Sequence, residues 1–127
     1  MTEDVMPVVA GAPVAQQRRD GVVVLQPLGR LDDALADELR LLALEAHAPV
    51  VIDLDRCTTF EASAIDRLAS AWQLHRPPLS LVAGDTGDRL MLERLASTWS
   101  VAVFGRVDDA IEARRRGPDG WAVRTGA

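Results

Sequence analysis

The short apolar segment 50–54, which directly follows Pro49, limits more than any other feature what this chain can fold into. An apolar run of this kind is typical of a buried strand. A polar turn follows it, and apolar residues with helical spacing begin near Ser63. The segment therefore predicts a strand, a loop and a helix N-terminus. Unpaired N–H groups at such an N-terminus attract polar and anionic groups, so we expect the functional surface of the protein here.

The rest of the chain fits one ordinary soluble domain. It has 127 residues, of which 48% are hydrophobic and 26% are charged, enough for one core but not for two. The net charge of −5 argues against nucleic-acid binding, because neutralising phosphates requires a basic face. We find neither a secretory signal at Met1–Asp4 nor an apolar run long enough to cross a membrane. We therefore expect a cytoplasmic protein.

Cysteine and histidine are too few to suggest a metal site or a disulfide. Cys57 is the one cysteine, and His47 and His75 are far apart in sequence. No nucleophile–base pair, paired carboxylates or phosphate-binding loop is recognisable, because 84–87 lacks the lysine and spacing of a P-loop. We therefore expect no metal, no cofactor and no enzymatic activity.

Before the central strand, the sequence predicts a hairpin and an amphipathic helix. Asp20-Gly21 separates two extended runs, 15–19 and 22–28, and this dipeptide is typical of a hairpin turn. Asp32 or Asp33 can cap the following helix. Its apolar residues lie on one face, and Pro49 ends it near His47; the apolar residues are Leu35, Leu39, Leu42 and Ala46.

After the central strand, helices and strands alternate to the end of the chain. We expect helices at about 63–75, around 90–96 and from 108, with strands at 79–83 and 100–104. This order predicts a mixed, mainly parallel α/β sheet with an N-terminal β-hairpin and about four helices, packed mainly on one face. We divide the chain into an arm or edge strand (1–13), one domain (14–114) and a C-terminal tail (115–127).

Several polar residues around the central turn have simple structural interpretations. Ser63 is best interpreted as the N-cap of the second helix, with Asp66 three residues on as in a capping box. Thr58 and Thr59 are expected to bond to loop backbone, and Glu61 favours the helix dipole. Cys57 is a candidate redox sensor, although a small buried hydrophobe is the commoner role.

Short sequence motifs occur in a specific order along the chain: Leu28–Asp32, Val50–Leu54, Leu81–Gly84, Val103-Phe104 and Asp108–Ile111. In order and spacing they resemble the STAS family, the sulphate-transporter and anti-sigma-factor-antagonist domain, over residues 14–114. The fold that this resemblance implies agrees with the one predicted from periodicity.

The phosphorylation motif of the family is changed in this chain. Antagonists of this type carry Asp-Ser-Ser-Gly-Leu after the central strand, and an anti-sigma factor that is also a kinase phosphorylates the first serine. The resemblance places Ala62 at that position, between Glu61 and Ser63. Because alanine cannot be phosphorylated, the usual switch lacks its hydroxyl. The remaining phosphoacceptor candidates are Ser63, Thr59 and Thr58.

The resemblance implies an anti-sigma factor antagonist that binds a serine-kinase anti-sigma factor and frees a sigma factor to regulate transcription, as in a stress response. The alternatives are a STAS subunit of an ABC lipid-transport or stress-signalling assembly, and a small-ligand or nucleotide-binding regulator. The expected partner surface joins the central loop, the next helix and the neighbouring turn; it comprises Asp32, Asp33, Thr59, Glu61, Ala62, Ser63, Asp66 and Arg67.

Overall fold

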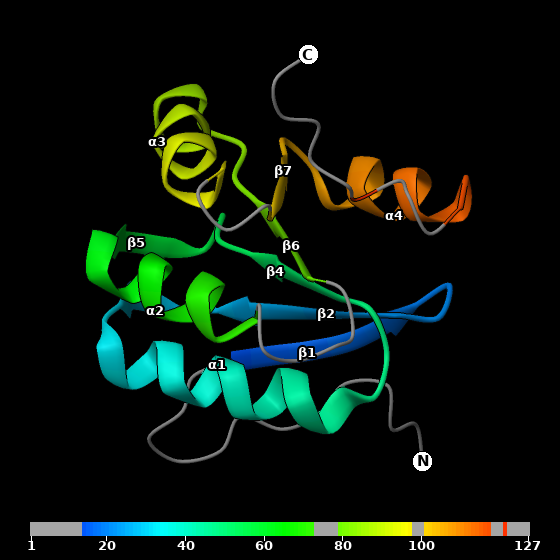
Figure 1. Cartoon of the computed structure of the whole chain (residues 1–127), viewed down its shortest axis with the longest axis horizontal. Coiled ribbons are helices and arrows are strands. Elements are labelled where there is room, and N and C mark those ends of the chain that lie inside the picture. The colour runs from blue at the N-terminus through cyan, green and yellow to red at the C-terminus, as the bar shows by residue number, and fades with distance from the viewer. Residues whose placement is uncertain (1–13, 73–78, 98–100, 118–120, 122–127) are drawn as a thin grey trace.

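The computed structural model describes residues 14–72, 79–97, 101–117 and Trp121, with the side chains of 69–72 and 95–97 excepted. Five strands form one sheet in the order β1-β2-β4-β6-β7, and two short strands, β3 and β5, form a second (Figure 1). The strands are β1 Val14–Arg19, β2 Val22–Pro27, β3 Gly29–Leu31, β4 Val50–Asp53, β5 Cys57–Phe60, β6 Leu79–Val82 and β7 Ala102–Phe104. The helices are α1 Asp33–Ala46, α2 Ala62–Trp72, α3 Thr86–Ser97 and α4 Val107–Arg115.

The predicted hairpin is confirmed. β1 and β2 pair antiparallel, from Val14 opposite Pro27 to Arg19 opposite Val22. The two turn residues, Asp20 and Gly21, have φ angles of 54° and 78°. Positive φ at both central positions is the geometry of a type I′ turn, whose twist matches that of the strands it joins.

The remaining pairs of the large sheet are parallel, as the alternation of strands and helices predicts. β4 lies between β2 and β6, with Val51 opposite Val24 and Ser80. β7 pairs with β6 and ends the sheet. The carboxyl ends of β2, β4, β6 and β7 therefore share one edge, where the loops leading to the helices begin.

Two apolar clusters lie on the two faces of this sheet. The first packs α1, α2 and α3 against alternate strand residues, through side chains that include Leu39, Ile65 and Leu92. The second packs α4 against the intervening residues, such as Val24 and Val51. Three helices on one face and one on the other confirm the predicted fold class (Figure 1).

Trp121, which falls in the expected C-terminal tail, belongs to the second cluster. Its side chain is 4% exposed, and its indole N–H donates to the carbonyl oxygen of Ala110 across 2.7 Å. The guanidinium of Arg114 lies 5.6 Å from the centre of its ring. Residues 1–13 and most of 118–127 lie outside the described part of the chain, so the domain boundaries stay predictions.

An ion pair fastens the start of α4 to the hairpin. Arg19 donates to Oδ1 of Asp108 across 2.6 Å, linking residues 89 positions apart in sequence. This hydrogen bond, with the positive charge of Arg19, lowers the pKa of the Asp108 carboxyl. Helix α4 is thus held by this ion pair to the hairpin as well as by its apolar packing on the second face of the sheet.

The prediction that the chain passes from the central strand through a polar turn into the helix is wrong, because a further strand, β5, lies between them. Thr58 and Thr59 lie in β5, which pairs parallel with β3. Backbone bonds continue the pairing at both ends, from Gly29 N to the Arg56 carbonyl (3.3 Å) and from Glu61 N to the Leu31 carbonyl (3.1 Å). The polar composition of both segments hides this pairing from sequence analysis, since β-propensity depends on the neighbouring strand.

Candidate functional site

The first turns of α1 and α2 meet and bring three predicted surface residues together. The hydroxyl of Ser63 donates to Oδ1 of Asp33 across 3.1 Å. The guanidinium of Arg67 lies 3.6 Å from the other carboxylate oxygen of Asp33 and 3.5 Å from Oδ1 of Asp37. We call the group Asp33, Ser63 and Arg67, with the neighbouring Ala62 and Asp66, the α1–α2 surface.

The two strands of the small sheet position the edge of this surface. The guanidinium of Arg30 on β3 forms an ion pair with the carboxylate of Glu61, which follows β5. Leu31, next to Arg30, is fully buried and anchors β3 in the first cluster. The turns at 29–32 and 57–61 are therefore held to one another by backbone and side-chain bonds.

Asp32 caps α1, as predicted. Its Oδ1 accepts from the N–H of Leu35 across 2.9 Å, and its carbonyl accepts from Ala36 across 2.9 Å. An Asp at this position satisfies an N–H group that has no partner within the helix. The Asp32 carboxylate is thus engaged within α1, whereas that of Asp33 faces α2.

The interpretation of Ser63 as the N-cap of α2 is wrong. The helix begins at Ala62, and the carbonyl of Glu61 accepts from the N–H groups of Ala64 (3.0 Å) and Ile65 (3.2 Å). Ser63 therefore lies in the first helical turn, and its hydroxyl bonds to Asp33 rather than to its own helix. Sequence spacing misses this contact because the partner is 30 residues away and depends on how α1 and α2 pack.

The sequence correctly separates the exposed and buried sides of α2. Ala64, Ile65 and Leu68 are buried in the first cluster. Of the predicted surface, Asp32, Asp33 and Glu61 are partly buried, and the other residues are exposed: Thr59, Ala62, Ser63, Asp66 and Arg67. His75 and Trp99 lie outside the described residues.

Cys57 lies on β5 against the first cluster and is partly buried. Its thiol donates a weak hydrogen bond to the carbonyl oxygen of Pro27 across 3.6 Å. Burial, followed by the negative charge of Asp53, raises the pKa of the Cys57 thiol to about 11. Reactive cysteines have a lowered pKa, so this environment favours a packing role over redox sensing.

A polar network at the carboxyl end of β4 was not foreseen from the sequence. The buried Asp53 accepts from Gln26 Nε2 (2.8 Å) and from the N–H of Asp55 (3.0 Å). Asp55 in turn accepts from the N–H of Gly84 across 2.6 Å. A Cβ at residue 84 would lie 3.1 Å from that same oxygen, so glycine permits this close approach. The network fixes the turn that leads into β5. In the sequence, the only indication of it is the acidic Asp53 at the end of an otherwise apolar strand.

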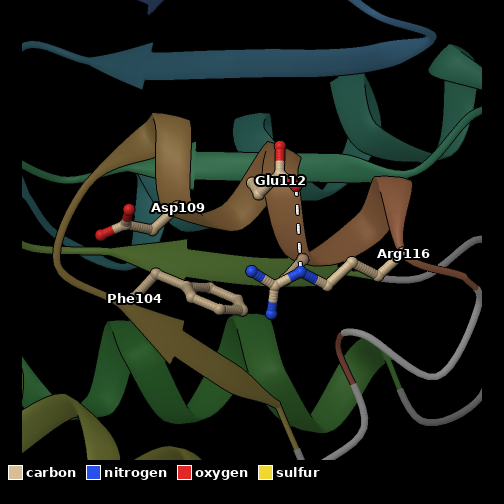
Figure 2. A pocket seen from close by; sticks show the side chains of 5 residues that line it. Phe104, Asp109, Glu112 and Arg116 are labelled. Carbon is tan, nitrogen blue, oxygen red and sulfur yellow. Dashed lines mark ion pairs between the residues drawn. The ribbon is translucent and has the colours of Figure 1, made fainter.

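A pocket between β7 and α4 was also missed. It has a volume of about 240 Å³ and is lined by Phe104, Asp109, Glu112, Ala113 and Arg116 (Figure 2). Four of these residues come from α4 and its C-cap: Asp109, Glu112, Ala113 and Arg116. From one turn to the next they are three or four positions apart, which places them on one face of the helix. We call this feature the β7–α4 pocket. Because α4 covers the second face of the sheet, the pocket is separate from the α1–α2 surface.

None of the helices in the described ranges combines the length and apolar character needed to cross a bilayer. Within the same ranges, no group of three or more His, Cys, Asp or Glu side chains is arranged to hold a metal ion.

No family model matches the sequence, and no curated protein matches it. Comparison with solved structures gives clear matches. An anti-sigma factor antagonist from Mycobacterium paratuberculosis has a TM-score of 0.64 and 23% sequence identity, covering 80% of this chain and 92% of its own. The anti-sigma factor antagonist SpoIIAA, in its unphosphorylated form, has a TM-score of 0.54 and 13% identity, covering 82% of this chain and 97% of its own.

Each likeness covers about four fifths of this chain and more than nine tenths of the matched chain. At these sequence identities they bear on the fold. The chain therefore has the STAS fold, as its sequence motifs indicated.

Proposed function

We propose that this protein is an anti-sigma factor antagonist, which binds an anti-sigma factor and so frees a sigma factor for transcription. Two antagonists of known structure share its fold over about four fifths of the chain, 80% and 82%. The observation that carries the proposal is the α1–α2 surface. The first turn of α2 is exposed there, and backbone hydrogen bonds between β3 and β5 hold the adjoining turns in place. Such a preformed surface binds without a large ordering cost.

The contact residues proposed are those at the start of the two helices and on the adjoining turn. Ser63 and Arg67 already make specific bonds across this surface to Asp33. Glu61 adds a further carboxylate at its edge. Ala62 and Asp66, which are exposed beside these bonds, complete the proposed contact.

The partner proposed is an anti-sigma factor of the serine-kinase type. Ala62 is exposed at the beginning of α2. The resemblance to the STAS family assigns it to the position where antagonists of that family carry the phosphoacceptor. Without a hydroxyl there, a phosphate cannot add its charge of about −1.5 to −2 to the contact. The protein would then bind its partner constitutively, as a cytoplasmic binding protein that catalyses no reaction itself.

The test is release of the sigma factor from its complex with the cognate anti-sigma factor. Purified protein, added in excess to that complex, should displace the sigma factor, and gel filtration would resolve the free and bound species. A complex that stays intact while the added protein remains unbound would refute the proposal. An Asp66→Arg variant is the loss-of-binding control. It changes an exposed residue of the α1–α2 surface and should displace less sigma factor at the same concentration.

A further inference from the structure

The β7–α4 pocket combines an apolar wall with two carboxylates. Phe104 and Ala113 are partly buried, whereas Asp109 and Glu112 extend from the exposed side of α4. Figure 2 shows Phe104 below the helix and the acidic side chains along it. A flat aromatic ring beside acceptor-only groups is suited to a cation that also has an apolar stem.

Both carboxylates are held loosely by the chain's own arginines. Arg116 Nε lies 3.8 Å from Glu112, Arg115 lies 3.7 Å from its other oxygen, and Arg106 Nε lies 3.9 Å from Asp109. Charge-assisted hydrogen bonds are typically about 2.7–2.9 Å long. The carboxylates therefore retain acceptor capacity for an incoming donor.

Arg116 contributes a guanidinium to the wall of this pocket. Its side chain turns back along α4, and its guanidinium reaches the space between Glu112 and Phe104 (Figure 2). The side chain is nevertheless 76% exposed, so it can leave the pocket at little cost. An arginine from another molecule could then take the same place.

The pocket also lies beside an edge of the sheet. β7 is the last strand in the order, and no strand in the described ranges pairs with its outer side. Ala102 and Phe104 both face the second cluster, with Val103 on the opposite face. An extended segment paired with β7 would therefore place alternate side chains next to Phe104, the arrangement by which sheet edges recognise peptides.

We propose that the β7–α4 pocket is a docking site for an arginine side chain presented by an extended segment of a protein partner. The guanidinium binds Glu112 and Asp109, and its stem packs on Phe104. A planar guanidinium suits this site better than an ammonium, because it can stack on the ring while it donates in two directions. The site lies on the face of α4, so it does not depend on the proposed function of the α1–α2 surface.

The probe is a blocked tripeptide, acetyl-Val-Arg-Val-amide, titrated into the full chain and followed by two-dimensional 1H–15N NMR. Saturable shifts should centre on residues 102–116. The counterpart with citrulline, which has the same shape but no charge, should bind at least tenfold more weakly. Equal binding of the two peptides, or shifts centred elsewhere, would overturn the proposal.

Two variants should change the affinity in opposite directions. Glu112→Gln removes an acceptor charge and should weaken binding at least fivefold, whereas Arg116→Ala removes the internal competitor and should strengthen binding. Glu38→Gln, on an exposed position of α1, is the matched control and should leave the affinity unchanged. Weaker binding by the Arg116→Ala protein would show that Arg116 recruits the peptide, which would refute the proposed site.

Discussion

The hydroxyl of Ser63 donates a hydrogen bond to Oδ1 of Asp33 across 3.1 Å, joining the first turn of α2 to that of α1. Arg67, one turn later on α2, lies near the same carboxylate and also near Asp37. The two helix starts are thus fixed relative to each other before any partner arrives. Changes on this surface should therefore alter recognition more than folding.

A negative charge at position 62, or a positive charge at position 66, should weaken binding to the anti-sigma factor. We expect Ala62→Asp and Asp66→Arg each to lower the affinity more than tenfold, about 1.4 kcal/mol. Both positions are exposed, so the melting temperature should stay nearly unchanged. Isothermal titration calorimetry and thermal unfolding would measure the two quantities.

Glu45→Arg, on an exposed position near the C-terminal end of α1, is the control for this pair, because it makes a comparable charge change about 18 Å along the helix from Asp33. If that variant lost binding to the anti-sigma factor and the other two kept it, the α1–α2 surface would be the wrong assignment.

ATP should not prevent the protein from binding a kinase-type anti-sigma factor, because Ala62 offers no hydroxyl at the usual acceptor position. A pull-down with and without ATP, followed by mass spectrometry of the bound protein, would measure this. Binding abolished by ATP, with phosphate on Ser63, Thr58 or Thr59, would contradict the prediction and identify a replacement acceptor.

The thiol of Cys57 should react slowly with alkylating reagents. Its pKa is raised from 9.0 to about 11, which reduces the reactive thiolate at pH 8 about a hundredfold relative to an ordinary cysteine. Iodoacetamide labelling of folded and urea-unfolded protein compares the two states directly, since the chain has one cysteine. Equal rates in both states would argue against the buried environment.

The same pKa shift has a consequence for stability. The folded protein holds the thiol proton more tightly than the unfolded chain, so this contribution is complete below pH 9 and is lost between pH 9 and about 11. Cys57→Ala should remove that pH dependence, cost at most a few kcal/mol through a small cavity, and leave partner binding insensitive to oxidant.

Ser80→Ala should leave the protein as stable or make it more stable. The Ser80 side chain is fully buried on β6 between Val51 and Ala102, and its hydroxyl has no hydrogen-bond partner among the described residues. An unsatisfied buried polar group costs roughly 1–3 kcal/mol. Urea unfolding would measure the change, with the exposed Ser63→Ala as the comparison. A loss of more than 1 kcal/mol would mean that the hydroxyl is bonded in solution.

Trp121→Ala should destabilise the protein by about 3–5 kcal/mol, because it empties a large buried site beneath α4. Trp121→Phe should cost less, since it keeps much of the apolar contact and loses the hydrogen bond to Ala110. Chemical unfolding of both variants would rank them. A Trp121→Ala protein within 0.5 kcal/mol of the parent would show that this contact adds little to the fold.

The main sheet and its helices could be predicted from the sequence because apolar periodicity determines them locally. The Asp20-Gly21 turn, the Asp32 cap and the buried side of α2 all depend on residues within a few positions of one another. The expectation that the turn before α1 lies beside the start of α2 came instead from the resemblance to the STAS family, and the contacts of Asp33 with Ser63 and Arg67 agree with it.

The contacts that were missed join residues far apart in sequence. The β3–β5 pairing and the Ser63–Asp33 bond each span about 30 residues and involve polar groups without periodicity. The β7–α4 pocket requires the placement of α4 beside β7, and the burial of Trp121 requires the chain to return onto α4. Local patterns cannot supply any of these, because tertiary packing decides them.

The small β3–β5 sheet suggests how the sequence of such a surface can diverge while its shape persists. Its strands are held by N–H and carbonyl groups, such as those of Gly29, Leu31, Arg56 and Glu61, and almost any residue supplies these groups. The side chains of Thr58, Thr59 and Ala62, which are exposed, are consequently not required to hold this pairing. Substitutions at these positions can therefore change the chemistry that the surface presents without changing its backbone shape.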